Sequence, residues 1–132
     1  VIGDLPDELM RAHDSSVEIH SLFVKEAKPG VSCSDLYRLA LKKAEKTGFG
    51  EYFNGYGEGR VRFVGHGLGL EIDEYPILAP RFTQKLERGM VIALEPMFVF
   101  SGKGIVGLED DYLVTARGVE RLTLTDQAII RV

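Results

Sequence analysis

Apolar residues near the start of the chain recur at spacings of three and four, which is the period of one face of an α-helix. The recurring positions are Leu5, Leu9, Ala12, Ser16, Ile19, Phe23 and Ala27. Asp4 and Pro6 suit the start of this helix, as an acidic cap and an early proline. Pro29-Gly30 would end it. The pattern therefore predicts a first amphipathic helix.

A second helix is indicated by a capping sequence. Ser32-Cys33-Ser34-Asp35 has the Ser-x-x-Asp form of a capping box, and Val31 and Leu36 flank it as a hydrophobic staple would. We expect this helix to run to about Thr47, with Gly48 as its terminator. A polar, glycine-rich stretch then follows.

From Val61 onward, short apolar runs alternate with turn sequences, which is typical of β-strands. The predicted strands lie at about 61–66, 90–100, 105–115, 119–123 and 127–132. Two helices followed by a mostly antiparallel sheet make an α+β order. No linker or internal repeat divides the chain, so we expect residues 1–132 to form a single domain.

Composition narrows the function classes. A net charge of −4 gives no support for nucleic-acid binding, which needs a clustered basic surface. No apolar stretch approaches the roughly 18–20 residues that span a bilayer, so no membrane association is expected. The one cysteine, Cys33, excludes an internal disulfide and is expected to be a packed thiol. A reducing, cytoplasmic location is therefore expected.

Two glutamates interrupt apolar runs that otherwise predict a β-hairpin. Glu95 lies within the run 90–100 and Glu109 follows the run 105–108, with the turn sequence Ser101-Gly102-Lys103-Gly104 between the runs. Counting back from this turn places the two glutamates opposite each other or one step diagonal. Like charges that close in an apolar sheet are destabilising, so either a shared proton or a divalent cation is expected to offset the repulsion.

A histidine between two glycines, Gly65-His66-Gly67, is the next candidate. A lone strand histidine is most often a packing or surface residue, but flanking glycines allow other groups to approach closely. An imidazole with two carboxylates suits Mn²⁺, Co²⁺, Fe²⁺ or Zn²⁺. Three such ligands suffice for one catalytic zinc but not for a two-metal site. The other histidines, His13 and His20, are expected to be solvated or packing residues.

Three motifs in order resemble those of the "pita-bread" metallopeptidases, a family that includes Xaa-Pro aminopeptidase, Xaa-Pro dipeptidase (prolidase) and methionine aminopeptidase. The first is Gly65-His66-Gly67-Leu68-Gly69-Leu70 followed by Glu74-Tyr75-Pro76. The second is Gly89-Met90-Val91 leading to Glu95-Pro96, and the third begins at Glu109-Asp110. The resemblance covers nearly the whole chain and is to the C-terminal half of the family's catalytic domain.

The resemblance implies a fold and a metal site. The fold would be half of a pita-bread fold, with two N-terminal helices packed on a mostly antiparallel, curved β-sheet. In the family two divalent ions are held by two aspartates, one histidine and two glutamates. Carried over by motif, His66 would bind a metal, Glu95 would bind a metal and shuttle a proton, and Glu109 would bridge both ions. The native metal stays open among Mn, Co, Fe and Zn.

The two aspartate ligands precede, in the family, the segment that resembles residues 1–5. We therefore expect this chain to be a fragment with an incomplete site and little activity alone. Two departures from the family also stand out. Asp73 replaces a second histidine that contacts substrate, and Gly107 replaces an arginine. Asp73 is a candidate substrate-binding residue, because an aspartate can anchor a substrate amine.

The expected function is hydrolysis of Xaa-Pro bonds in short proline-containing peptides by a dinuclear metal-dependent peptidase. Two alternatives remain open. One is a peptide- or protein-binding module that keeps the fold without catalysis, and the other is an α+β domain whose acids merely share a proton. A single half of the fold would expose a sheet edge and apolar surface. We therefore expect a homodimer that pairs about a twofold axis.

Overall fold

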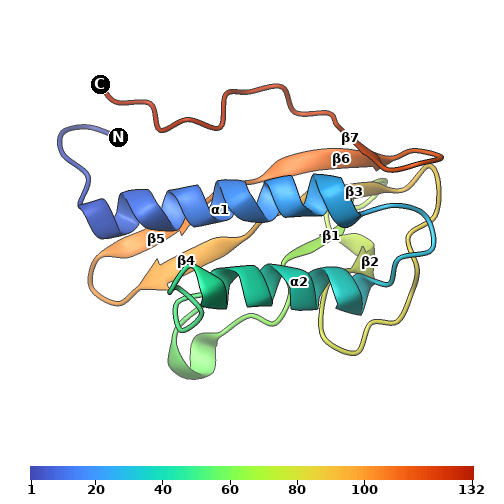
Figure 1. Ribbon diagram of the computed structural model, residues 1–132, viewed down its shortest axis with the longest axis horizontal. Coiled ribbons are helices and arrows are strands. Elements are labelled where there is room, and N and C mark those ends of the chain that lie inside the picture. The colour runs from blue at the N-terminus through green and yellow to red at the C-terminus, as the bar shows by residue number, and fades with distance from the viewer.

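Two helices lie side by side across one face of a β-sheet (Figure 1). The computed structural model describes residues 1–132. Helix α1 spans Asp7–Glu26 and helix α2 spans Cys33–Lys46. A short 3₁₀ helix, η1, spans Gly57–Gly59. The strands are β1 (Gly65–Gly67), β2 (Glu74–Ile77), β3 (Val91–Leu94), β4 (Met97–Phe100), β5 (Gly104–Gly107), β6 (Asp110–Val114) and β7 (Val119–Arg121).

The strands form a five-stranded sheet in the order β2-β1-β3-β6-β7 and a two-stranded hairpin, β4-β5. Every pairing is antiparallel. The predicted α+β class with two N-terminal helices on a mostly antiparallel sheet is therefore confirmed. Neither helix combines the length and the apolar composition that crossing a bilayer requires.

The start of α2 agrees with the sequence prediction, whereas the start of α1 does not. The Ser32 hydroxyl accepts a hydrogen bond of 3.2 Å from the backbone N–H of Asp35, as a capping box requires. At its other end α2 stops at Thr47, and Gly48 adopts a φ of +88°. Helix α1 begins only at Asp7, and Pro6 precedes it without a side-chain cap, so the predicted cap at Asp4 is wrong.

The strand predictions need several corrections, and one is that the predicted strand 105–115 is two strands, β5 and β6. The run 90–100 is divided into β3 and β4 at Glu95-Pro96, where proline has no N–H for the ladder. The predicted strand 61–66 is replaced by the short β1 at Gly65–Gly67, and residues 127–132 form no strand. The sequence prediction missed β2, because its Pro76 argues against a strand; β2 lies at the sheet edge, where proline is tolerated.

The core lies between the helices and the sheet. Helix α1 contributes Ile19 and Phe23, and α2 contributes Leu36, each buried in one apolar cluster with Phe98 and Tyr112 of the strands. Burial on one face explains why the period of three and four predicted the first helix correctly. Cys33 is fully buried in the same cluster, which confirms the prediction of a packed thiol.

Candidate active site

The hairpin register brings two glutamates face to face. Leu94 pairs with Asp110 at the end of the β3–β6 ladder, and Met97 pairs with Gly107 at the start of the β4–β5 ladder. These two pairs share one register. Continuing it one step beyond Leu94 and Asp110 places Glu95 directly opposite Glu109, at the break between the two sheets. The sequence prediction of an opposed pair is thus consistent with the register.

His66 lies on β1, between β2 and β3, where it pairs with Ile77 and Ala93. Its flanking glycines serve the close approach of these neighbouring strands. A Cβ atom on Gly65 would lie 2.4 Å from the Ala93 carbonyl oxygen, and one on Gly67 would lie 2.4 Å from the Tyr75 carbonyl oxygen. Larger residues at either position would push the strands apart and displace the imidazole.

The imidazole of His66 lies between two carboxylates. Its Nε2 atom is 3.3 Å from Oε1 of Glu95, and its Nδ1 atom is 3.3 Å from Oδ1 of Asp73. Nδ1 is also 3.0 Å from the Gly67 carbonyl oxygen, which accepts when this nitrogen carries the proton. That tautomer leaves the Nε2 lone pair free to bind a cation on the side of Glu95.

The surroundings of Glu95 oppose its ionisation. Burial raises the pKa of its carboxyl; His66 acts in the opposite direction, and the nearby charges of Glu109 and Asp73 raise it further. Its side chain is 21 % exposed, against 9 % for His66 and 64 % for Asp73. Three acidic side chains, those of Glu95, Glu109 and Asp73, therefore lie near one imidazole, and a bound cation would relieve this excess of negative charge.

Glu109 is more exposed than Glu95, because it lies at the break where the chain leaves β5. No three or more His, Cys, Asp or Glu side chains are arranged to hold a metal ion. The donor types fit a divalent transition metal, since an imidazole and carboxylates converge here. The expected residues His66, Glu95 and Glu109 therefore lie on β1, at the end of β3 and at the start of β6, without closing into a binding site.

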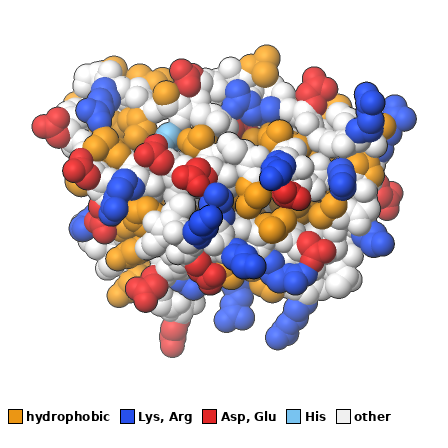
Figure 2. Space-filling view, in the orientation of Figure 1, with side chains coloured by type: hydrophobic (Ala, Val, Ile, Leu, Met, Phe, Trp, Pro, Cys, Tyr) orange, Lys and Arg blue, Asp and Glu red, His pale blue; other side chains and the backbone are white.

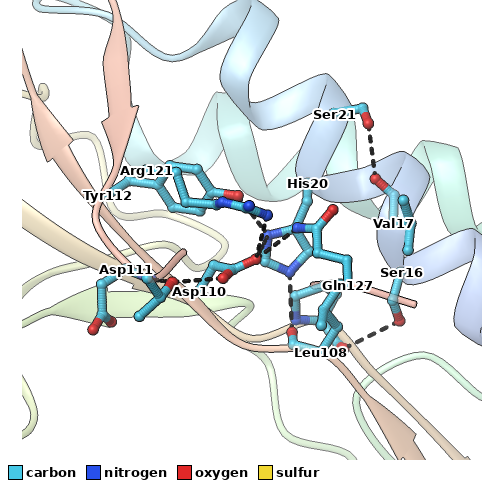
Figure 3. Close-up of polar contacts among 12 residues, drawn as sticks. Ser16, Val17, His20, Ser21, Leu108, Asp110, Asp111, Tyr112, Arg121 and Gln127 are labelled. Carbon is cyan, nitrogen blue, oxygen red and sulfur yellow. Dashed lines mark hydrogen bonds and ion pairs between the residues drawn. The ribbon is translucent and has the colours of Figure 1, made fainter. Parts of the chain in front are cut away.

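A buried polar network joins helix α1 to the segment around Glu109 and to strand β6 (Figure 3). Nε2 of His20 donates a hydrogen bond of 3.0 Å to the Leu108 carbonyl oxygen, so its Nδ1 accepts from the Tyr112 hydroxyl at 2.8 Å. Asp110 is 1 % exposed. Its carboxylate accepts hydrogen bonds from Thr123 and Gln127, at 2.5 and 2.6 Å, and lies 3.7 Å from Arg121.

Helix α1 thereby binds both sides of the break between the sheets. Ser16 donates to the Pro96 carbonyl at 3.4 Å, and His20, one turn later, reaches the Leu108 carbonyl. These carbonyls directly follow Glu95 and directly precede Glu109. The sequence prediction missed this role, although two polar residues four apart on an apolar face were a signal. His20 is a buried packing residue, as expected.

Comparison with known proteins agrees with this arrangement. Residues 1–116 match the model of metallopeptidase family M24. The chain is 33 % identical over 130 residues to an Xaa-Pro dipeptidase of Pyrococcus horikoshii, covering 98 % of this chain and 35 % of that protein. It superposes on the X-Pro aminopeptidase of Thermotoga maritima with a TM-score of 0.88 at 30 % identity, covering 99 % of this chain and 35 % of that one.

The prolidase of Pyrococcus furiosus is also similar in structure, with a TM-score of 0.84 and 32 % identity over 94 % of this chain and 35 % of that one. The chain thus spans about a third of the length of the relatives it matches. The expected resemblance and the expected half of a pita-bread fold are confirmed. The chain belongs to metallopeptidase family M24.

Proposed function

We propose that a longer protein containing this chain hydrolyses Xaa-Pro bonds in short peptides with the help of divalent metal ions. The observation that carries the proposal is the position of His66, with Glu95 on one nitrogen and Asp73 on the other. The opposed Glu109 supplies the second glutamate that the family's motifs require. The similarity to Xaa-Pro dipeptidases and aminopeptidases supports the substrate class.

Each residue has a role in this proposal. His66, through Nε2, and the carboxylates of Glu95 and Glu109 would hold the metal pair, whose identity is Mn, Co, Fe or Zn. Bound ions of this kind polarise a carbonyl and lower the pKa of water. Glu95 also transfers a proton to the leaving amine. Asp73 is exposed enough to accept a hydrogen bond from the amino group of a peptide substrate.

We further propose that the 132 residues form one domain, the C-terminal portion of a peptidase catalytic domain, with little activity alone. This rests on the absence of a closed three-ligand group and on the short span of the relatives that is matched. A cytoplasmic location is proposed from the single, buried cysteine. Association into a homodimer is proposed from the exposed apolar side chains of residues 70–75.

The test is an assay of Ala-Pro and Ala-Pro-Ala hydrolysis, with and without Mn²⁺. Cleavage is measured as the release of free amino acid. We expect cleavage by a longer protein that contains this chain and none by the 132-residue chain. Glu95→Gln in the longer protein should abolish turnover, because it removes both a metal ligand and the proton carrier. Cleavage that persists in EDTA, or that ignores proline, would contradict the proposal.

A second candidate is a peptide- or protein-binding module that has lost catalysis. Two departures favour it: Asp73 where the family carries histidine, and Gly107 where it often carries arginine. Such a module would bind proline-containing peptides equally well with and without metal. Peptide affinity that is unchanged by EDTA, together with no hydrolysis by the longer protein, would favour this candidate over the peptidase.

A further inference from the structure

A second site lies away from His66, under the N-terminal half of α2. A cavity of about 540 Å³ is bounded by α2, the segment around residues 60–62 and the loop at residues 80–81. Nine residues line it; four are arginines and none is acidic. The arginines are Arg38, Arg60, Arg62 and Arg81. Its volume falls in the range of about 300–1,000 Å³ that is typical of small-molecule sites.

The arginines are unequally paired. Arg38 forms an ion pair with Asp35, and Arg60 donates to the carbonyls of Gly50 and Glu51, so both are held in place. Neither Arg62 nor Arg81 forms an ion pair with an acidic side chain. The chain as a whole carries a net charge of −4. Around this cavity the arginine charges repel one another, and they attract anions.

The cavity wall combines this charge with aromatic surface. Tyr37 and Phe53 both line it and are 7 % and 1 % exposed, so their rings are fixed in the core. Burial raises the pKa of the Tyr37 hydroxyl, and the charges of Arg60 and Arg62 act in the opposite direction. A ligand here would meet several arginine N–H donors above core side chains that expose little of their surface.

The backbone at Arg81 is a further sign that this side chain is required. Arg81 adopts a φ of +69°, in the left-handed region that favours glycine. A non-glycine residue there costs about 1–2 kcal/mol. Strain of this kind persists mainly where a side chain serves a function. Arg81 thus has a backbone that glycine would suit better and a guanidinium that lines the cavity.

We propose that this cavity, which we call the arginine pocket, binds a soluble small molecule that carries a phosphate group. The planar guanidinium group of arginine can donate two parallel hydrogen bonds to phosphate oxygens, and Arg62 and Arg81 each provide one such group. The surface view agrees with an anionic ligand, since Lys and Arg side chains gather over α2 on the face shown (Figure 2).

The experiment is calorimetric titration of the chain with inorganic pyrophosphate and with ADP, in EDTA so that no ion at His66 contributes. Wild type should bind both. Arg62→Gln/Arg81→Gln should weaken binding about tenfold or more, since two charge-assisted contacts are lost. The control Lys42→Gln/Lys46→Gln removes the same charge from exposed positions of α2 that do not line the pocket. It should change affinity by about twofold or less in 0.15 M salt, because exposed charges are screened.

A second variant separates binding from folding. Arg81→Gly should keep or raise the melting temperature, because glycine suits the left-handed backbone, and should still weaken pyrophosphate binding. No binding at millimolar pyrophosphate, or equal losses in the two double variants, would overturn the proposal. Binding only to phosphatidylcholine vesicles that carry a phosphorylated lipid, without binding of free pyrophosphate or ADP, would also overturn it.

Discussion

Glu95 lies opposite Glu109 across the break in the hairpin, and only Glu95 also contacts His66, at 3.3 Å. The two glutamates are unequal partners. Glu109 is exposed and can be hydrated, whereas Glu95 is partly buried and its pKa is raised. The unfavourable charge is therefore concentrated on Glu95, at the position proposed for metal binding and proton transfer. A site with this arrangement is expected to lower the stability of the metal-free chain.

Glu95→Gln should stabilise the metal-free chain by roughly 0.2–1 kcal/mol, because it removes one member of a like-charge cross-strand pair. The measurement is urea unfolding at pH 7.5 in EDTA. The control is Glu120→Gln at an exposed position of β7, which should leave the free energy of unfolding unchanged. If the two variants gave the same change, the repulsion at Glu95 would be too small to matter.

Asp73 should contribute to cation binding through His66. Asp73→Asn removes the negative charge beside Nδ1 and should weaken Mn²⁺ binding at least about tenfold, as loss of such supporting carboxylates does in other metal sites. Binding is measured by NMR, as the paramagnetic broadening of the His66 ring signals when Mn²⁺ is added, because this broadening also detects weak binding. Glu58→Gln, at an exposed position of η1, is the matched charge control. Unchanged broadening in Asp73→Asn would show that Asp73 has no such role.

Much of the fold could be predicted because local patterns and burial agree. The period of three and four predicted the first helix, and the capping sequence at Ser32 predicted the start of α2. The glycine-rich turn at residues 101–104 fixed the register that places Glu95 opposite Glu109. The edge strand β2 could not be predicted, because Pro76 is tolerated there only through its position in the completed sheet.

The site was predictable where motifs carry it and not where distant residues meet. His66, Glu95 and Asp73 were selected from sequence and lie together. The burial of Asp110 depends on Arg121 and Gln127, together with His20 from α1, and no local pattern links these positions. The exposure of Glu109 likewise follows from its position between β5 and β6. The sequence of residues 105–115 gives no sign that the strand is interrupted there.

The network behind the site should make stability depend on pH. Burial lowers the pKa of His20 below its usual value of 6.5, so the folded state keeps it neutral where the unfolded state is protonated. This contribution is fully present above about pH 6.5 and is lost as the pH falls below it, by up to about 1.4 kcal/mol per pH unit. Urea unfolding between pH 7.5 and 5.5 should show a smaller loss in His20→Gln than in wild type, while His13→Gln should match wild type. Equal slopes in all three proteins would contradict this assignment.

The exposed turn before β2 should mediate self-association. Leu70 is 102 % exposed and Ile72 is 83 % exposed, next to an edge strand whose Tyr75 is 70 % exposed. An apolar patch beside an unpaired sheet edge favours pairing with a second copy. Light scattering should therefore give the mass of a dimer at micromolar concentration, and Ile72→Lys should give a monomer because it places a charge in the contact. Leu124→Lys, at a site 82 % exposed and outside this turn, should remain dimeric. A monomeric wild type under these conditions would exclude the proposed homodimer.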